Sequence, residues 1–187
     1  EEKIKLPLIG IISRLADQKG FDLIAEISEI LLSLDLTIVI LGTGEPKYHA
    51  LFTSLQKKYP DNLSVNLTFD NKLAHLIEAG SDMFLMPSRY EPCGLNQLYS
   101  LKYGTIPVVR KTGGLADTIE DYDEITESGT GFVFENYDSK ELLNAVKRAL
   151  NIYNIPKAWI KLMITAMEKD YSWDRSARRY IELYSGM

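Results

Sequence analysis

Residues 83–110 read MFLMPSRYEPCGLNQLYSLKYGTIPVVR, and this stretch decides the fold class. The short apolar run Met83–Met86 stops at a Pro-Ser pair and predicts a buried strand. Residues 95–103 predict a helix, and 106–110 predict the next strand, although Pro107 cannot donate a hydrogen bond to a neighbouring strand. A strand, a helix and a second strand in this order indicate a βαβ unit with parallel strands.

The same alternation extends along the rest of the chain. Further strands are predicted over 7–12, 37–41, 63–67 and 131–134, and further helices over 19–34, 46–58, 71–79, 138–153, from Pro156 onward and over 173–184. This pattern predicts an α/β fold with a doubly wound, mostly parallel, Rossmann-like sheet. We interpret residues 1–187 as one domain, in which residues 154–187 form a helical C-terminal extension.

Local signals place several ends and loops. Asp138 and Glu141 resemble a capping box at the start of a helix, and Ser172 is placed to cap the last one. The stretch 117–131 is rich in Asp, Glu, Thr, Ser and Gly, and it predicts a surface loop.

The composition is that of an ordinary folded domain, with 45% hydrophobic and 25% charged residues. No run of about 18 apolar residues occurs, so hydropathy predicts no membrane-spanning helix. Twenty-one Lys and Arg against 26 Asp and Glu give a net charge of −5, which disfavours a duplex nucleic acid as ligand. Cys93 is the one cysteine, and with His49 and His75 it offers too few ligands for a zinc site.

Ligands of doubly wound sheets bind beyond the carboxyl ends of the strands. The segments that follow the predicted strands here are 13–20, 42–45, 69–70, 88–94 and 111–115. Most of them are rich in Gly, in charge or in both, as a phosphate-bearing ligand requires. Neither the G-x-G-x-x-G dinucleotide fingerprint nor the G-x-x-x-x-G-K-[ST] P-loop is present.

Two cations, Arg14 and Lys19, lie five residues apart in the first of these segments. A guanidinium fork and a compact ammonium charge are well suited to a diphosphate. Helix N-termini after Gly94 and Gly114 can add backbone N–H groups that bind an anion or sugar hydroxyls. The spacing alone leaves open that Arg14 and Lys19 are solvated surface charges.

Motifs in order along the chain are similar to those of a known family. They are S-R-L and Q-K-G within 13–20, P-S-R-Y-E-P-C-G-L-N-Q-L at 87–98, Y-G at 103–104 and P-V-V-R-K-T-G-G-L-A-D-T at 107–118. Over about residues 7–184 the chain resembles the C-terminal, donor-binding domain of bacterial glycogen synthase and plant starch synthase. The resemblance implies a GT-B architecture, in which the active site lies between two Rossmann-like domains. This chain resembles only the second of them.

The resemblance also implies roles for individual residues. Arg14 and Lys19 would hold the donor diphosphate, and Glu91 would bind glucose hydroxyls and stabilise developing oxocarbenium charge. Phe69 would stack on adenine, although packing in the core is the alternative for this side chain. The implied catalytic set is Arg14, Lys19 and Glu91, and the implied substrate- and nucleotide-binding set is Phe69, Cys93, Gly94, Leu95, Asn96, Gly113 and Gly114.

One position departs from the pattern of many GT-B relatives, and one motif has no role in the resemblance. Position 99 is Tyr where many GT-B relatives carry a second Glu, so a mechanism with two carboxylates is not supported. Asp121-Tyr122-Asp123 has the D-x-D form of metal-dependent transferases of another fold, but we interpret it as part of a solvated acidic loop. His49 and His75 are expected on helix faces.

The implied function is that of the donor-binding domain of a retaining glucosyltransferase, which moves glucose from ADP-glucose to the end of an α-1,4-glucan. Neither a metal nor a cofactor is implied. Expected partners are ADP-glucose or ADP, the glucan and the N-terminal domain of the same enzyme, and not nucleic acid or a membrane. The expected location is the bacterial cytoplasm, or the plastid for a plant protein. The chain alone is expected to be inactive.

Three alternatives remain at this point. The first is a GT-B transferase that uses UDP-glucose or another sugar, because the polar contacts of the base pocket cannot be predicted. The second is a non-catalytic nucleotide-sugar-binding module, although such a module has no need of Glu91. The third is a Rossmann oxidoreductase, which the missing glycine fingerprint disfavours.

Overall fold

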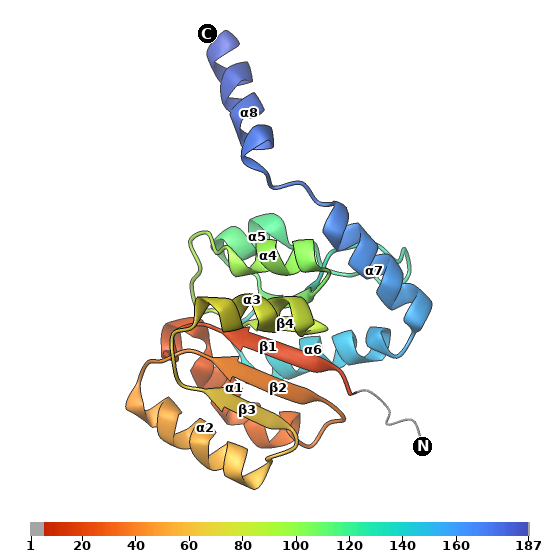
Figure 1. Cartoon of the computed structure of the whole chain (residues 1–187). Helices are drawn as coiled ribbons and strands as arrows, with labels where there is room; N and C mark the ends of the chain where they lie inside the picture. Colours follow the sequence, from red (N-terminus) through yellow and green to blue (C-terminus); the bar gives the residue numbers. More distant parts are fainter. Residues whose placement is uncertain (1–5, 187) are drawn as a thin grey trace.

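Six short strands form one sheet in the computed structural model, which describes residues 6–186 (Figure 1). The strands are β1 (Leu8–Ile12), β2 (Thr37–Leu41), β3 (Leu63–Asn66), β4 (Met83–Met86), β5 (Ile106–Arg110) and β6 (Phe132–Phe134). Their order in the sheet is β3-β2-β1-β4-β5-β6, and every neighbouring pair is parallel. The predicted doubly wound α/β fold is confirmed.

Helices cover both faces of this sheet. They are α1 (Phe21–Leu31), α2 (Pro46–Lys58), α3 (Asn71–Gly80), α4 (Asn96–Tyr103), α5 (Gly113–Thr118), α6 (Ser139–Tyr153), α7 (Pro156–Glu168) and α8 (Trp173–Ser185). Helices α3 and α4 lie on one face, and α1 and α6 pack together on the other (Figure 1). Because both faces are covered, the central strands β1, β4 and β5 are almost continuously apolar, and Phe21, Phe52, Phe84 and Phe132 are fully buried.

The predicted C-terminal extension divides into two different parts. Helix α7 belongs to the packed body, since Trp159 and Leu162 are buried in the main core. Helix α8 has no buried residue and extends away from the body (Figure 1). Its exposed side chains include Trp173 and Tyr184, and none of its described residues packs into the main core.

Pro107 occupies β5 without breaking the sheet. The N–H of Ile106 donates to Asp82 O on the β4 side at 3.0 Å. Successive N–H groups of a strand point to opposite sides, so the missing donor at Pro107 faces β6. The ladder to β6 begins one residue later, at Val108 and Phe132, and no ladder bond is lost there.

The helix predicted over 19–34 begins later than expected. Asp17–Lys19 form a single 3₁₀ turn, and α1 starts at Phe21 after Gly20. Gly20 has a φ of +79°, and a Cβ at this position would lie 2.2 Å from Pro87 O. The left-handed conformation and the close backbone contact both require glycine. Because α1 begins only after Gly20, the turn that ends with Lys19 lies next to the segment that follows β4.

The predicted caps are present. The Asp138 carboxylate accepts hydrogen bonds from the N–H groups of Lys140 and Glu141 and begins α6. The Glu141 carboxylate accepts instead from Glu135 and Asn136, so it fixes the approach to the helix rather than closing a full capping box. Ser172 Oγ accepts from Arg175 N and caps α8.

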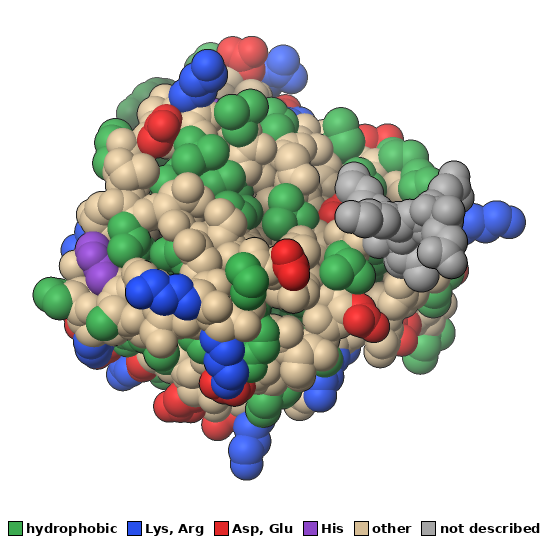
Figure 2. Space-filling model, turned by 60° about the horizontal axis from the view of Figure 1, so that its bottom comes forward, with side chains coloured by type: hydrophobic (Ala, Val, Ile, Leu, Met, Phe, Trp, Pro, Cys, Tyr) green, Lys and Arg blue, Asp and Glu red, His purple; other side chains and the backbone are tan. Residues whose placement is uncertain are grey.

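Surface charges of both signs are interspersed on the face shown in Figure 2. Within residues 6–186, no helix has both the length and the apolar character needed to cross a bilayer.

Glu78 on α3 is an ionisable side chain within the packed body. It is 3% exposed, and the His75 ring nitrogen Nδ1 lies 3.8 Å from its carboxylate. Burial raises the pKa of Glu78 to about 7. The folded protein therefore binds this proton more tightly than the unfolded chain does. The contribution of Glu78 to stability falls as the pH rises from about 4.5, the ordinary value, to about 7.

We predict that Glu78→Gln stabilises the fold more at pH 8 than at pH 5. The difference in free energy of unfolding between variant and native chain should increase by roughly 2 kcal/mol over this interval, because Gln carries no charge to bury. Urea denaturation at both pH values measures it. The exposed Glu26→Gln is the matched control, and a His75→Gln background removes the neighbouring imidazole. A difference that is independent of pH would contradict the raised pKa.

Candidate active site

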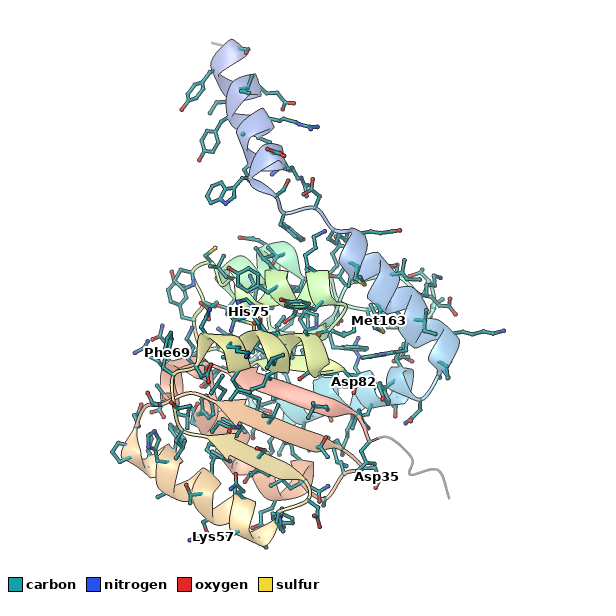
Figure 3. The ribbon with its side chains drawn as sticks, viewed as in Figure 1. Asp35, Lys57, Phe69, His75, Asp82 and Met163 are labelled. Carbon is teal, nitrogen blue, oxygen red and sulfur yellow. The ribbon has the colours of Figure 1, made fainter. Side chains whose placement is uncertain are left out.

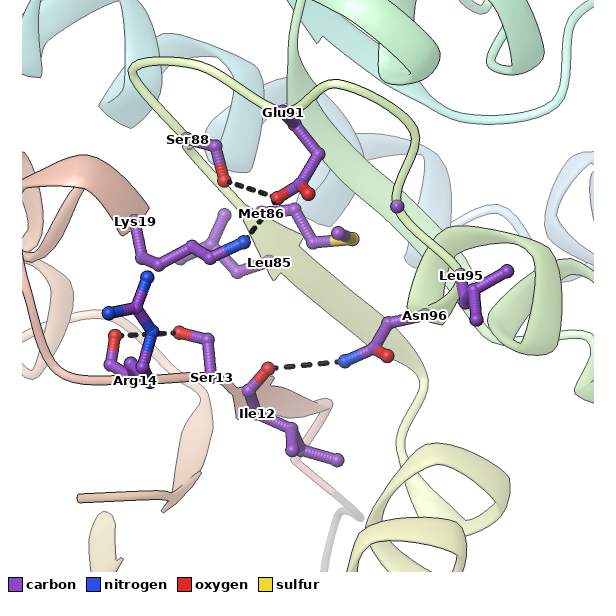
Figure 4. Close-up of a pocket in the computed structure, with 11 residues that line it drawn as sticks. Ile12, Ser13, Arg14, Lys19, Leu85, Met86, Ser88, Glu91, Leu95 and Asn96 are labelled. Carbon is purple, nitrogen blue, oxygen red and sulfur yellow. Dashed lines mark hydrogen bonds and ion pairs between the residues drawn. The ribbon is translucent and has the colours of Figure 1, made fainter.

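The main candidate site lies where β1 and β4 end side by side. The chain leaves these two neighbouring strands in opposite directions along the sheet, toward β2 and toward β5, which opens a crevice at their carboxyl ends. The pocket in this crevice is lined by Ile12, Ser13, Arg14, Lys19, Leu85, Met86, Ser88, Glu91, Gly94, Leu95 and Asn96 (Figure 4). Six of the predicted site residues therefore meet in one place: Arg14, Lys19, Glu91, Gly94, Leu95 and Asn96.

An ion pair joins the two loops that form the pocket. Lys19 Nζ lies 2.6 Å from Glu91 Oε2, and the hydroxyl of Ser88 donates to the same oxygen at 3.2 Å (Figure 4). The side chains of Lys19 and Glu91 are only 21% and 10% exposed. These contacts fix the orientation of the carboxylate. An ammonium group has three N–H donors, so Lys19 can hold Glu91 and still donate to a phosphate oxygen.

Arg14 stands beside this pair on the segment after β1. Its Nη2 donates to Gln18 Oε1 at 3.1 Å, and its side chain is largely exposed to the pocket and to solvent. The guanidinium group therefore keeps most of its donors available for an anion. Two cations and one carboxylate converge in this pocket. The spacing of Arg14 and Lys19 in the sequence could not show this arrangement.

Phe69 lies in a second pocket that continues from the first. Both are lined by Ile12, Ser13, Arg14 and Asn96, and the second adds Leu41, Gly42, Thr43, Thr68, Phe69, Asp70, Asn71 and Ala74. Phe69 is 92% exposed, which rules out the core-packing alternative. Figure 3 places Phe69 at the opposite end of the sheet from Asp35 and Asp82, at the carboxyl ends of the strands.

The N-terminus of α4 forms one wall of the main pocket. Gly94, Leu95 and Asn96 line it, and Gly94 has a φ of +74° that allows the chain to turn into the helix. Leu95 at the N-cap has no side-chain oxygen to bind the first N–H groups of the helix. Asn96 Nδ2 donates to Ile12 O at 3.2 Å and ties this helix start to the end of β1.

Cys93, Gly113 and Gly114 line neither pocket, and their predicted contact with the ligand stays a prediction. Gly114 N donates to Glu91 O at 3.0 Å. A Cβ on Gly113 would lie 2.1 Å from Glu91 O, and a Cβ on Gly114 would lie 2.0 Å from Cys93 O. The two glycines thus let the start of α5 support the loop that carries Glu91.

Three other polar side chains help to build the site, and the sequence analysis gave them no role there. Ser88 orients Glu91, as described above. The buried Gln97 amide donates to Cys93 O and Gly94 O at 2.9 and 3.1 Å and holds the same loop. His49 Nε2 accepts from Gly44 N at 2.9 Å and fixes the turn after β2. The sequence offered one signal for two of these residues: Gln97 and His49 both lie in or near the first turn of a helix that follows a glycine turn.

The acidic loop is held by hydrogen bonds within it and by contacts with β6 and α6. The Asp123 carboxylate accepts from the N–H and the hydroxyl of Thr126 and from the N–H of Ile125, and these hydrogen bonds lower the pKa of Asp123. Asp121 accepts from Val133 N and pairs with Arg148. In the described part of the chain, no group of three or more His, Cys, Asp or Glu side chains is arranged to hold a metal ion.

Comparison with known proteins agrees with this geometry. Residues 1–163 match the family model of glycosyl transferases group 1. The glycogen synthase of Kosmotoga olearia is 56% identical over 181 residues, which cover 97% of this chain and 38% of that protein. That of Thermosipho melanesiensis is 54% identical over 185 residues, which cover 98% and 38%. The chain thus spans well under half of the length of these relatives and matches their C-terminal part.

A solved structure gives the same result. The catalytic domain of starch synthase IV from Arabidopsis thaliana, bound to ADP and acarbose, superimposes with a TM-score of 0.88 at 37% identity, covering 98% of this chain and 39% of that one. The fold is therefore that of one domain of a GT-B glycosyltransferase. With a family match that includes the main pocket and all but the last part of the chain, this protein belongs to the glycosyl transferases group 1.

Proposed function

We propose that this chain is the donor-binding domain of a retaining glucosyltransferase that extends an α-1,4-glucan from ADP-glucose. The observation that carries the proposal is the convergence of Arg14, Lys19 and Glu91 in one pocket at the ends of β1 and β4. The names of the relatives support a glucan as the product, and the ADP in the starch synthase structure supports this donor. Since the glycogen synthase relatives are bacterial, we assign the reaction to the bacterial cytoplasm.

The two cations act on the leaving group. When the bond between glucose and ADP breaks, negative charge develops on the departing phosphate, and fixed positive groups stabilise it without reorganisation. Arg14 offers a planar fork and Lys19 a compact charge, both on the segment after β1. A phosphate leaving group needs no strong general acid, which agrees with a site that pairs its carboxylate with a lysine.

Glu91 acts on the sugar. Its carboxylate is oriented by Lys19 and Ser88 through one oxygen, Oε2, which leaves Oε1 to accept hydrogen bonds from glucose hydroxyls. The negative charge, held in a largely buried position, also stabilises the positive charge that develops on the glucose ring in an oxocarbenium-like transition state. The unpaired first N–H groups of α4 can donate to the hydroxyls or the phosphate from the facing wall.

The nucleoside occupies the second pocket in this proposal. Phe69 offers an exposed ring for stacking, and Leu41 and Ala74 add apolar contact. Stacking tolerates several bases, so this pocket by itself supports ADP and UDP alike. The ADP bound in the starch synthase structure favours ADP, and UDP remains the second candidate.

The acceptor glucan and the remaining grip on the sugar come from another domain of the same enzyme. The chain covers about 38% of the relatives that it matches, which leaves room for such a domain. Without it the donor site is open to water and the two substrates are not held together. Lost positioning alone can remove ~7–11 kcal/mol of barrier reduction.

We predict that Arg14→Ala or Lys19→Ala in the full-length enzyme lowers turnover by ~10²–10³, the scale for one preorganised charge stabiliser. Initial rates with labelled ADP-glucose and glycogen measure this effect. Lys57→Ala, an exposed lysine of α2 outside both pockets, is the matched control and should stay within about twofold. Unchanged turnover in both site variants would sink the phosphate assignment.

Glu91→Gln in the full-length enzyme is predicted to reduce kcat far more than it changes the affinity for ADP. An interaction realised mainly in the transition state has this effect. Steady-state kinetics and calorimetric titration with ADP separate the two quantities. If ADP affinity fell in step with kcat, Glu91 would be a ligand of the nucleotide instead.

The chain by itself is predicted to bind ADP, more weakly than the full-length enzyme, and to transfer no glucose. Titration with ADP, UDP, ADP-glucose and UDP-glucose, beside an incorporation assay with glycogen, tests both parts. Tighter binding of UDP than of ADP would favour the second candidate donor. Turnover close to that of the full-length enzyme would contradict the need for another domain, and no binding of any nucleotide would contradict the donor-site assignment.

A further inference from the structure

We propose that Tyr137, which lies outside both pockets, is a positioning residue that holds Lys19 and Glu91 in contact; this inference rests on the function proposed above. Tyr137 lies between β6 and α6, more than 40 residues after Glu91 in the sequence. It lines neither pocket. Its contacts nevertheless reach both of the loops that form the main pocket.

The hydroxyl of Tyr137 binds the loop that carries Lys19. The Oη atom lies 3.0 Å from Asp17 O and within hydrogen-bonding distance of Asp22 Oδ1, so its one proton is shared between these two acceptors. Burial raises the pKa of Tyr137, so the phenol stays protonated and remains a donor near neutral pH. Asp17 is in the 3₁₀ turn that ends with Lys19, and Asp22 is in the first turn of α1.

The ring of Tyr137 contacts the loop that carries Glu91. The guanidinium carbon of Arg89 lies 4.2 Å from the ring centroid, and that of Arg110 lies 5.5 Å from it. Both distances are within the range of a cation–π interaction. Arg89 also pairs with the second oxygen of Asp22, Oδ2, at 2.9 Å. Asp22 therefore accepts from Tyr137 with one oxygen and from Arg89 with the other.

Arg110 extends the network along the backbone before Glu91. Its Nε donates to Ser88 O at 3.0 Å, and its Nη2 donates to Arg89 O. The N–H of Arg89 donates in turn to Gln18 O at 2.9 Å. Each of these contacts fixes backbone next to a residue of the pocket, because Ser88 and Gln18 directly bind Glu91 and Arg14.

The consequence for the site follows from its dimensions. Lys19 and Glu91 are separated by 72 residues and meet at 2.6 Å, so a small shift of either loop separates them. A misplacement of about 1 Å can cost about 10²-fold in rate. Tyr137 is the side chain that touches Asp17 and Asp22 on one loop and the guanidinium of Arg89 on the other. Removing its hydroxyl loosens the pair without altering any group that lines the pocket.

The test uses Tyr137→Phe in the full-length enzyme, a change that keeps the ring and removes the hydroxyl. We expect kcat to fall about tenfold, with a smaller change in the KM for ADP-glucose. Tyr59→Phe is the matched control, since the Tyr59 hydroxyl also donates to a carboxylate, that of Glu29, and a lysine lies over its ring far from the site. This control should stay within about twofold.

A double-mutant cycle distinguishes positioning from a general loss of stability. If Tyr137 acts through Glu91, then Tyr137→Phe should have almost no further effect on kcat in a Glu91→Gln background, whereas independent effects would multiply. Amide hydrogen exchange should be faster over residues 88–94 in the Tyr137→Phe variant and unchanged in β1 and β4. Unchanged kcat, or multiplicative effects with unchanged exchange in 88–94, would overturn the proposal.

The failure of the proposed function has a different signature. If the native full-length enzyme transfers no glucose, the proposed function is wrong, and the exchange of residues 88–94 then decides the positioning role without any assay of activity. Faster exchange in this loop in Tyr137→Phe, but not in Tyr59→Phe, would still support Tyr137 as the residue that holds the two loops together.

Discussion

The contact between the Lys19 ammonium and the Glu91 carboxylate depends on the order of the strands. Lys19 follows β1 and Glu91 follows β4, and these strands are neighbours only because the chain returns to the centre of the sheet after β3. Parallel strands end at the same edge, so the segments that follow them meet there. The helices on both faces are needed to make this sheet stable, and through it they fix the place of the ion pair.

The ion pair between Lys19 and Glu91 also requires polar partners around it. With 21% and 10% of the side chains exposed, both charges have lost much of their water, and each depends on the other and on nearby donors. Ser88 supplies one such donor to Glu91. A largely desolvated pair of this kind is costly to break, so it gives the pocket a defined arrangement of charge before any substrate arrives.

Close backbone contacts bring the loops near enough for this arrangement. Gly20 lies against Pro87 O, Gly113 against Glu91 O and Gly114 against Cys93 O, in each case at a distance that a Cβ would not allow. The side chains that support these contacts, including Gln97 and Tyr137, lie behind the pocket. The groups that line the pocket are thus held in place by close glycine contacts and by side chains that bind the backbone behind them.

Local sequence patterns were sufficient to predict the sheet and most of its helices. The runs 37–41, 83–86 and 106–110 are strands with the predicted limits. The spacing of apolar residues and the residues that end each run act over only a few positions, so they can be read from the sequence. Its motifs also singled out Arg14, Lys19 and Glu91, and they pointed to the family that the comparisons confirm. The start of α1 was wrong, since the conformation of Gly20 depends on its contact with Pro87, a residue distant in the sequence.

Which of those residues touch each other depends on how distant parts of the chain pack together. No local pattern shows that Lys19 binds Glu91, that Phe69 is 92% exposed or that Gly113 and Gly114 support a loop outside the pockets. Tyr137 carried no signal at all, because its role lies in contacts with loops more than 40 residues away. Local propensity acts over a few residues, whereas such contacts exist only after the sheet has brought distant strands together.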